Sequence, residues 1–542
     1  MNRAPSAALG RVVIIMTDAF QIDFEPIGRR GIARPGQTLL AAAQAAGVGL
    51  ASVCGGAGTC EECRLRLVSG RLTPPTLVEQ AVLTEADLAT GIRLACQAEP
   101  LGEVKVDIPP ESLTTAQRLQ VEGQETEFVL HPAITTPAAY GLAVDIGTTK
   151  LAAYLVRLET GETVARAGAM NPQVAFGEDV ISRIAYAGRE KKGAKTLQTI
   201  LVDAVNSLLV GLCLEANVPA WNVLDAVVVG NTVMHHLFAG LPVEQLGHAP
   251  FKPATTLPLN LPASELGLHL GPGAKIYLPP VIAGYVGSDH ISMFLATGAC
   301  RSNGNMVALD IGTNTEIGLV TNGRVTCCSC ASGPAFEGAH IHEGMRAAPG
   351  AIERIRWSDG KFLWQCIDDL PPVGICGSGI LDGIAALQDG KLIKPNGGLQ
   401  AGVGSRITVV PATQTGMGRD LIITRKDVHE IQLAKSAIRA GIEVLLENGQ
   451  LTYADLDGFI VAGAFGTYLD LRSAIRTGMF PPLPLERFHQ VGNAAGMGAK
   501  QMLLSLDKRH EAEQLAGQIG YIELTGQTSF TPLFMKNLML EV

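Results

Sequence analysis

The chain has 542 residues, of which 47% are hydrophobic and 17% are charged, and its formal net charge is −9. This length predicts about two to four domains, the acidic charge argues against a nucleic-acid partner, and no uninterrupted apolar stretch has the roughly 18 residues that a membrane span needs. Because the eleven cysteines come without a recognisable secretion signal, we expect reduced thiols and a cytoplasmic protein with no membrane partner.

The first hundred residues alternate short apolar runs with one alanine-rich segment. Strands are predicted at residues 11–17, 63–70 and 104–110, where apolar residues concentrate or alternate. Residues 36–50, GQTLLAAAQAAGVGL, predict a short helix. This helix delivers the chain to a loop that is rich in glycine and cysteine.

Four cysteines of this region are separated by gaps of five, two and thirty-two residues. Disulfides need an oxidising compartment, structural zinc sites use paired C-x2–4-C hooks, and a [2Fe–2S] cluster uses three clustered thiolates with one distant thiolate. Gly55, Gly56 and Gly58 favour the cluster, because bare backbone can wrap closely around inorganic sulfides and donate N–H groups to them. Zinc stays the alternative. The predicted ligands are Cys54, Cys60, Cys63 and Cys96.

Residues from about 11 to 112, with the motifs CGGAGTCEECR and RLACQ, resemble a one-cluster ferredoxin domain. The resemblance implies a β-grasp fold, and the five-residue first gap is similar to the adrenodoxin-like branch. Residues 113–139 are polar and weakly patterned, which predicts a linker. The chain after residue 140 alternates strand-like and helical stretches, as α/β domains do.

Two segments after the linker share one design: LAVDIGTTKLAAYLV (142–156) and MVALDIGTNTEIGLV (306–320). Their aspartates lie 165 residues apart, which predicts two similar lobes. Each aspartate can hold a hydrated Mg²⁺, while turn N–H groups, hydroxyls and a lysine can bind phosphate. No G-x4-G-K-[ST] sequence is present, which argues against a P-loop. The candidates here are Asp145, Gly147, Thr148, Thr149, Lys150, Asp310, Gly312, Thr313, Asn314, Thr315 and Glu316.

A glycine-rich segment, GFIVAGAFGTYLD (458–470), and a small-residue helix in VGNAAGMGAKQMLLS (491–505) follow. This order resembles the acetate/sugar kinase, heat-shock chaperone and actin superfamily of ATPases. The resemblance implies a two-lobed, ribonuclease-H-like fold that binds ATP with Mg²⁺, with residues 284–298 and 493–500 as helices at the hinge. It also implies catalytic carboxylates at Asp145, Asp289 and Asp310, and further nucleotide contacts at Gly333, Glu337, Gly463 and Gly466.

A ferredoxin domain joined to such an ATPase resembles the reductive activators of corrinoid proteins. Four further segments carry the same resemblance: NPQVAFGEDVISRI (171–184), VVVGNTVMHHLFAGL (227–241), ASGPAFEGAHI (331–341) and GICGSGILDGI (374–384). The family implies a multidomain chain with boundaries at 1–112, 113–139, 140–300 and 301–542. It implies that ATP drives one electron from the [2Fe–2S] cluster into a Co(II) corrinoid protein. An upstream donor such as a ferredoxin or flavoprotein is also implied, and a homodimer is left open.

Two other functions stay open on sequence alone. One is a small-molecule kinase with a regulatory ferredoxin domain, although no distinctive sugar-binding motif is evident. The other is a plain electron carrier whose ATPase lobes serve only as a scaffold, although the retained aspartates and threonines argue against it. Activators of 2-hydroxyacyl-CoA dehydratases lack this N-terminal domain. Cys327, Cys328 and Cys330 are predicted to be packing residues rather than a second metal site.

Overall fold

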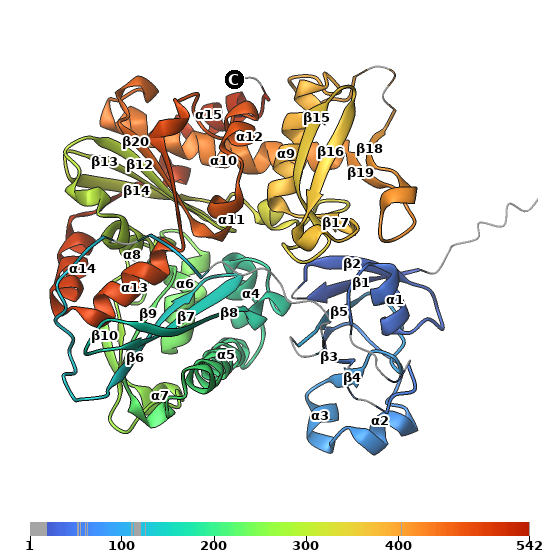
Figure 1. The fold of residues 1–542 in the computed structure, drawn as a ribbon, viewed down its shortest axis with the longest axis horizontal. Helices are drawn as coiled ribbons and strands as arrows, with labels where there is room; N and C mark the ends of the chain where they lie inside the picture. Colours follow the sequence, from blue (N-terminus) through green and yellow to red (C-terminus); the bar gives the residue numbers. More distant parts are fainter. Residues whose placement is uncertain are drawn as a thin grey trace, which may run out of the picture. The chain divides into compact units, whose positions relative to one another are not determined.

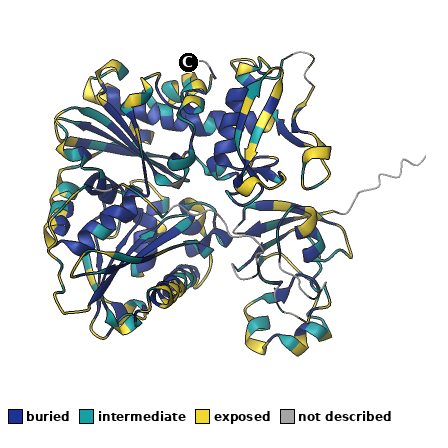
Figure 2. Cartoon of the chain, viewed as in Figure 1, coloured by how far each residue is buried: buried dark blue, intermediate teal, exposed yellow. Residues whose placement is uncertain are grey.

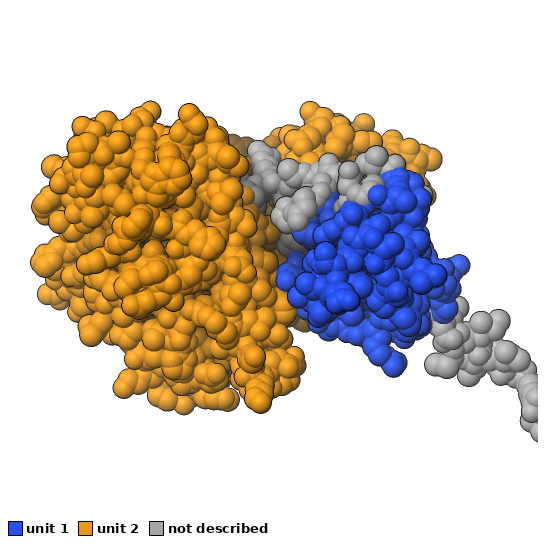
Figure 3. Space-filling view, turned by 90° about the horizontal axis from the view of Figure 1, so that it is seen from below, with its two compact units in different colours: residues 1–24, 30–114 blue, residues 25–29, 115–542 orange. Residues whose placement is uncertain are grey.

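The computed structural model describes residues 19–540, apart from residues 26, 51–53, 55, 60, 62, 110, 111, 113–120, 125, 401 and 403. The chain forms two compact units, coloured separately in Figure 3: residues 1–24 with 30–114, and residues 25–29 with 115–542. The strand predicted at residues 11–17 lies outside the described residues, as does part of the predicted linker.

The described residues of the first unit form a five-stranded sheet. Its strands are β1 (Phe20–Glu25), β2 (Arg29–Ala33), β3 (Arg64–Ser69), β4 (Ile92–Leu94) and β5 (Val104–Asp107), in the order β2-β1-β5-β3-β4 (Figure 1). The helix predicted at residues 36–50 is α1 (Leu39–Ala45), which begins where the Thr38 side chain accepts a hydrogen bond from the Ala41 amide. Capping boxes start α2 (Leu77–Val82) and α3 (Glu85–Ala89).

The second unit contains two six-stranded sheets. The strands of the first are β6 (Tyr140–Ile146), β7 (Lys150–Arg157), β8 (Thr163–Met170), β9 (Val223–Val229), β10 (Leu259–Pro262) and β11 (Lys275–Leu278). The strands of the second are β12 (Asn305–Ile311), β13 (Thr315–Thr321), β14 (Arg324–Cys330), β20 (Gly458–Ala462), β21 (Phe488–Gly492) and β22 (Gly520–Tyr521). Their orders are β10-β11-β9-β6-β7-β8 and β21-β20-β12-β13-β14-β22.

The two sheets repeat one pairing scheme. β6 is antiparallel to β7 and parallel to β9, and β12 is antiparallel to β13 and parallel to β20. Asp145 pairs across the hairpin with Ala152, and Asp310 pairs in the same way with Glu316. The two similar lobes that the repeated Asp-Ile-Gly-Thr motif predicts are therefore confirmed.

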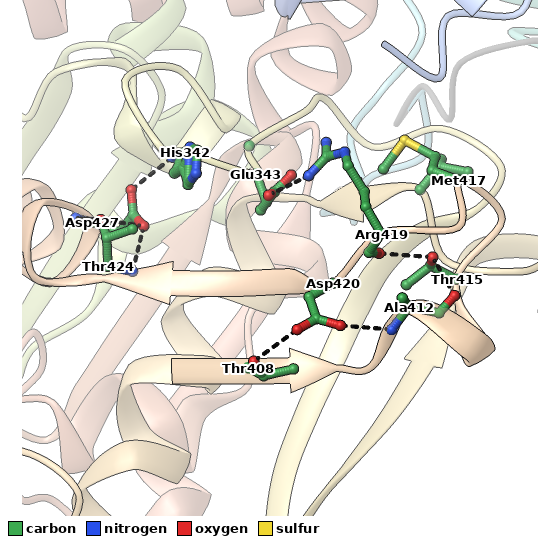
Figure 4. Close-up of polar contacts among 12 residues, drawn as sticks. His342, Glu343, Thr408, Ala412, Thr415, Met417, Arg419, Asp420, Thr424 and Asp427 are labelled. Atoms are coloured by element: carbon green, nitrogen blue, oxygen red, sulfur yellow. Dashed lines mark hydrogen bonds and ion pairs between the residues drawn. The ribbon is translucent and has the colours of Figure 1, made fainter. Parts of the chain in front are cut away.

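A smaller sheet and a hairpin complete the strands of this unit. They comprise β15 (Ala351–Ser358), β16 (Lys361–Cys366) and β17 (Gly374–Ile375), with β18 (Arg406–Val410) paired to β19 (Leu421–Thr424). Figure 4 shows how the hairpin is held: Asp420 accepts hydrogen bonds from the Ala412 amide at 2.7 Å and the Thr408 hydroxyl at 3.2 Å. Arg419 pairs with the buried Glu343 at 2.6 Å, which ties the hairpin turn to the body of the unit.

Helices cover both large sheets (Figure 1). They are α4 (Val180–Arg189), α5 (Gly193–Ala216), α6 (Thr232–Ala239), α7 (Ala263–Leu266), α8 (Ser288–Thr297), α9 (Gly377–Asp389), α10 (Arg425–Gly449), α11 (Gly463–Tyr468), α12 (Leu471–Arg476), α13 (Ala494–Leu504), α14 (Leu506–Gln518) and α15 (Phe530–Asn537). α13 comes late in the sequence, yet it packs on β6 and β9 of the first sheet and crosses α8.

The crossing of α8 and α13 depends on a bare Cα. A Cβ added to Gly498 would lie 2.1 Å from the Ser292 carbonyl oxygen, so the two helix backbones touch at this point. Residues of both helices share one core cluster with residues of both sheets. The small-residue helix predicted within residues 491–505 is therefore confirmed as α13, and its small residues let a second backbone approach closely.

One helix corrects an expectation from the sequence. α5 is long and apolar enough, by length and composition, to cross a membrane, although we expected no such segment. In the structure 56% of its apolar window is buried, and it packs on β7 and β8 while its outer face is exposed (Figure 2). α5 is thus a core helix of the second unit, and its mean hydropathy is high although charged residues interrupt its apolar residues.

The described part of the predicted linker, residues 121–139 without 125, lies along the second unit. Its backbone hydrogen bonds join Asn493 to Glu122 at 2.9 Å, Thr126 to Ala296 at 2.8 Å and His131 to Leu504 at 2.9 Å. Gly123 also forms an antiparallel bridge with Gly492, at the end of β21. This stretch is therefore fastened across the ends of α8 and α13.

Candidate functional site

A cavity in the second unit lies at the carboxyl ends of β6, β9, β12 and β20. Residues that end or follow these strands line it: Asp145, Asn231, Asp310 and Gly463. Most other predicted site residues also line it: Gly147, Thr148, Thr149, Lys150, Asp289, Gly312, Thr313, Asn314, Glu316 and Glu337. The two copies of the repeated motif thus face one space, at the sheet edge where α/β proteins bind ligands.

Of the five carboxylates that line this cavity, four lie close enough to influence one another's pKa: Asp145, Asp289, Asp310 and Glu316. Desolvation, and then the charge of Asp310, raise the pKa of Asp145 to about 7, although a hydrogen bond from Asn493 opposes the rise. Desolvation raises the pKa of Asp310 to about 6. Desolvation and the neighbouring carboxylates also raise the pKa of Asp289 and of Glu316 well above ordinary values. Acidic groups held this close favour a bound cation.

The raised pKa of Asp145 gives a prediction about stability. Its pKa is about 7 in the folded protein against an ordinary value of 3.8, so the folded state holds the proton more tightly. The free energy of unfolding therefore falls as pH rises from about 4 to about 7. Asp145→Asn, which cannot ionise, should unfold at a higher temperature than the wild type, by a margin that grows over this range and then levels off.

The gain in the free energy of unfolding should stay below about 4 kcal/mol. One pKa unit corresponds to about 1.4 kcal/mol, and solvent reaches this side chain and weakens the effect. The gain is measured by following the thermal unfolding of the second unit in both proteins, across the same pH range and without nucleotide. Identical pH profiles for the variant and the wild type would show that Asp145 ionises normally.

Side chains from outside the motif brace the first loop. Asn171 donates to the Gly147 carbonyl at 2.8 Å, and Asn231 donates to the Thr148 hydroxyl at 2.9 Å. The guanidinium of Arg183, which is fully buried, donates to the Thr148 carbonyl. Desolvation lowers the pKa of Arg183 to about 9, so this side chain keeps its positive charge beside the loop at neutral pH.

Three predicted contact residues do not line the cavity: Thr315, Gly333 and Gly466. The Thr315 hydroxyl is fully buried and bonds the Ser332 hydroxyl at 2.9 Å, while the Gly333 amide donates to the Thr313 carbonyl at 3.0 Å. Gly466 lies against β20, where an added Cβ would come within 2.8 Å of a side chain. Thr315 and Gly333 support the second loop from behind, and Gly466 lets α11 pack on its strand.

Gly463 lines the cavity for a reason that the sequence did not indicate. The family resemblance implies a nucleotide contact here; in the structure its φ is +88° and an added Cβ would lie 2.6 Å from Oδ1 of Asp310. The bare Cα at this turn therefore makes room for the Asp310 carboxylate, at a backbone conformation that favours glycine.

The remaining wall combines aromatic rings with a helix start. The rings of Phe336 and Phe465 stack with centroids 4.8 Å apart, and Tyr468 lies on the same lining. Gly377 and Ser378 open α9, so N–H groups at its first turn reach the cavity. An aromatic surface suits a nucleobase, and the helix start suits a phosphate.

Several lining residues were missed from the sequence: Asn231, Phe336, Arg346, Cys376, Gly377, Ser378, Phe465, Tyr468 and Asn493. For the two asparagines a signal was present, because each follows a strand and a glycine, in VVVGN and QVGN. Each also caps a helix, accepting from the Met234 amide at 3.0 Å and the Gly496 amide at 2.8 Å. A strand followed by Gly-Asn and a helix thus marked two positions at this sheet edge.

Three of the four predicted cluster ligands are described, while Cys60 lies outside the described residues. Cys63, which is fully buried, directly precedes β3, and Cys96, 7% exposed, follows β4. Cys54 is half-buried in the loop. Within the described residues no group of three or more His, Cys, Asp or Glu side chains is arranged to hold one metal ion.

The loop backbone fits an iron–sulfur cluster. Gly56 and Gly58 have φ values of +93° and +78°, the left-handed region that lets a loop curl inward. The side-chain amide of Gln97 donates to the Gly56 carbonyl at 3.0 Å and to the sulfur of Cys96 at 3.6 Å. A donor directed at a cysteine sulfur is typical of the surroundings of a thiolate ligand.

Cys327, Cys328 and Cys330 lie buried in β14. Desolvation raises the pKa of all three thiols, so none is a thiolate at neutral pH. Their strand, β14, pairs with β13 and packs against α10, and Cys328 and Cys330 belong to the main core cluster of the unit. The packing role that the sequence favours for them stays a prediction, and their burial supports it.

Comparisons with known proteins define the class. Three family descriptions match in chain order: "2Fe-2S iron-sulfur cluster binding domain" at residues 25–101, "RACo middle region" at 140–302 and "C-terminal domain of RACo the ASKHA domain" at 304–542. The chain is thus an iron–sulfur domain of the ferredoxin type joined to an actin-like ATPase.

Whole-chain relatives narrow the class. The "Corrinoid activation enzyme RamQ" of Eubacterium limosum is 33% identical over 417 residues, which cover 74% of this chain and 70% of that protein. The "[Co(II) methylated amine-specific corrinoid protein] reductase" of Methanosarcina barkeri is 27% identical over 72% of this chain and 75% of its own length. A solved "Reductive activator for corrinoid,iron-sulfur protein" matches 96% of this chain and 98% of its own, with a TM-score of 0.70 and 30% identity. The chain belongs to this family of corrinoid-protein activators.

Proposed function

We propose that this chain is an ATP-hydrolysing iron–sulfur oxidoreductase that transfers one electron to the Co(II) corrinoid of a partner protein. The product is Co(I), the nucleophile for methyl transfer. One observation carries the proposal: two Asp-Ile-Gly-Thr turns and four carboxylates converge on one cavity in a chain that also carries a ferredoxin-type cysteine loop. The family to which the chain belongs supports the same activity.

An ATPase is needed because the electron transfer is uphill. Co(I) corrinoids are strong reductants, and each deficit of about 59 mV lowers a one-electron equilibrium constant tenfold. Nucleotide can shift such an equilibrium only by binding two conformations with different affinity. The duplicated lobes, which meet at the crossing of α8 and α13, provide an element that can take two arrangements.

Cys54, Cys60, Cys63 and Cys96 would hold a [2Fe–2S] cluster, which supplies the single electron. The spacing of the cysteines supports this cluster type over zinc. Asp145 and Asp310 would hold a hydrated Mg²⁺, since this ion keeps several waters and binds through few carboxylates. Asp289 would orient the water that attacks the terminal phosphate. Thr148, Thr149, Lys150, Gly312, Thr313 and Asn314 would contact the phosphates.

The partners follow from this chemistry. A low-potential ferredoxin or flavoprotein would reload the cluster, because a one-electron centre must be reduced again after each transfer. The corrinoid protein would be the only macromolecular acceptor, and the reaction belongs in the cytoplasm, where thiols stay reduced. A homodimer is compatible with the proposal and is not required by it.

The deciding experiment mixes the anaerobically reconstituted protein with a Co(II) corrinoid protein and a chemical reductant. The visible spectrum should show Co(I) forming with Mg·ATP, and much more slowly without nucleotide or with a non-hydrolysable analogue. Electron paramagnetic resonance of the reduced protein alone should give the signal of one [2Fe–2S] centre.

Two results would refute the proposal. Co(I) formation at the same rate with and without ATP would mean that the second unit is a scaffold and does not drive the electron transfer. A protein that stays colourless after reconstitution, but binds zinc in a stoichiometric amount, would make the cysteine site structural.

A further inference from the structure

One carboxylate joins the two phosphate loops. Oε1 of Glu337 accepts a hydrogen bond from the Thr149 hydroxyl at 2.9 Å and another from the Thr313 hydroxyl at 2.6 Å. The two hydroxyl oxygens are 3.2 Å apart. Thr149 follows β6 and Thr313 follows β12, so a single oxygen atom spans the two halves of the duplicated fold.

These hydroxyls are the groups that a phosphate would use. Both threonines are more than nine-tenths buried, at 6% and 3% exposed, so their hydroxyls have little access to hydrogen bonds with bulk water. A threonine hydroxyl has one hydrogen to donate. It can therefore be given to the Glu337 carboxylate or to a phosphate oxygen, but not to both.

The charges around Glu337 also match those of a phosphate site. Its second oxygen lies 3.9 Å from Nε of Arg346, a side chain that is 6% exposed. The Glu337 charge also acts on the pKa of Lys150 and of Arg183, opposing the lowering that desolvation causes in both. Glu337 thus sits on the cationic side of the cavity, where an anionic ligand would be stabilised.

The four clustered carboxylates form the other side. The pKa values of Asp145, Asp289 and Glu316 are raised by desolvation and by carboxylates from within this group, Glu337 not being one of those neighbours. Glu337 therefore differs from them in its surroundings: they repel one another around a cation position, whereas it is surrounded by hydrogen-bond donors and cations.

We propose that Glu337 competes with nucleotide phosphate for the hydroxyls of Thr149 and Thr313. Phosphate entering the cavity takes both donors and the nearby cations, and the Glu337 carboxylate leaves them. The bridge between the two loops is then replaced by the nucleotide itself. Binding of ATP is in this way coupled to movement of the segment Pro334–Glu337, which follows β14. The inference rests on the nucleotide site proposed above and adds its regulation.

The test compares nucleotide affinities of four proteins: wild type, Glu337→Gln, Glu337→Ala and the control Glu511→Ala. Glu511 lies on α14, outside the cavity lining, and its loss removes the same charge. Affinity is measured by isothermal titration with Mg·AMPPNP, which is not hydrolysed. Glu337→Ala should bind it at least about tenfold more tightly than the wild type, because an anionic competitor has been removed. Glu337→Gln, which keeps an acceptor oxygen without the charge, should fall between it and the wild type.

Each other outcome has a defined meaning. Weaker or unchanged binding by Glu337→Ala, in a protein whose thermal unfolding shows an intact second unit, overturns the inference, because a phosphate or magnesium ligand would behave in this way. Equal tightening by Glu511→Ala also overturns it, since net charge alone would then explain the gain. If the wild type itself does not bind Mg·AMPPNP, the proposed nucleotide site fails, and that failure is seen before any variant is compared.

Discussion

Asp310→Asn should abolish ATP-dependent formation of Co(I) and leave the visible spectrum of the cluster unchanged. Asp310 is the next-to-last residue of β12, lines the cavity and lies against the bare Cα of Gly463. Asparagine keeps the shape but loses the charge that would hold hydrated Mg²⁺ beside the phosphates. We expect the rate of ATP hydrolysis to fall about 100-fold or more, the scale on which a single electrostatic contact at a reacting centre acts.

The control for this variant is Asp203→Asn, on the exposed face of α5. It should hydrolyse ATP and support Co(I) formation at the wild-type rate. The measurement follows phosphate release and the corrinoid spectrum in the same reaction. Wild-type Co(I) formation by Asp310→Asn would show that the cavity carboxylates do not serve the electron transfer.

Gly498→Ala should destabilise the second unit, although alanine is ordinarily the better helix former. Its added Cβ would lie 2.1 Å from the Ser292 carbonyl oxygen, a backbone atom that cannot rotate away, so α8 and α13 must separate. Overpacking of this kind costs about 1–3 kcal/mol, and here a gain in helix propensity of about 1 kcal/mol offsets only part of it. The thermal unfolding midpoint of the second unit should fall.

Gly517→Ala, in α14, is the matched control. A Cβ there meets no atom within 4 Å, so only the gain in helix propensity applies and the midpoint should rise slightly. The cluster spectrum should be the same in both variants, because the cysteine loop belongs to the other unit. A higher midpoint for Gly498→Ala would mean that the two helices are not in contact at this point.

The sequence predicted the parts of the site that lie within one repeated motif. Asp145 and Asp310 could be found because the same strand and turn occur twice. The four cysteines could be found because their spacing is typical of a [2Fe–2S] site. The same reasoning named Thr315 and Gly333 as contacts, and neither lines the cavity. Position in a motif does not say whether a side chain faces a cavity or the turn behind it, and here the Ser332 hydroxyl draws Thr315 inward.

Other residues could not be predicted because distant segments supply them. Arg346, Phe465 and Asn493 come from three separate stretches and meet only when the second sheet and α13 close around the cavity. The hydropathy of α5 was missed for a different reason. Its buried face decides its place in the fold, and charged and polar residues interrupt its apolar residues along the sequence. The pattern of a single sequence does not indicate which distant strands pair with one another.

The described stretch before β6 is part of the second unit rather than a spacer. A free chain over residues 121–139 could extend by roughly 60 Å, but backbone hydrogen bonds hold this stretch to the ends of α8 and α13. A deletion or insertion within it would therefore disturb the helix pair of the ATPase itself.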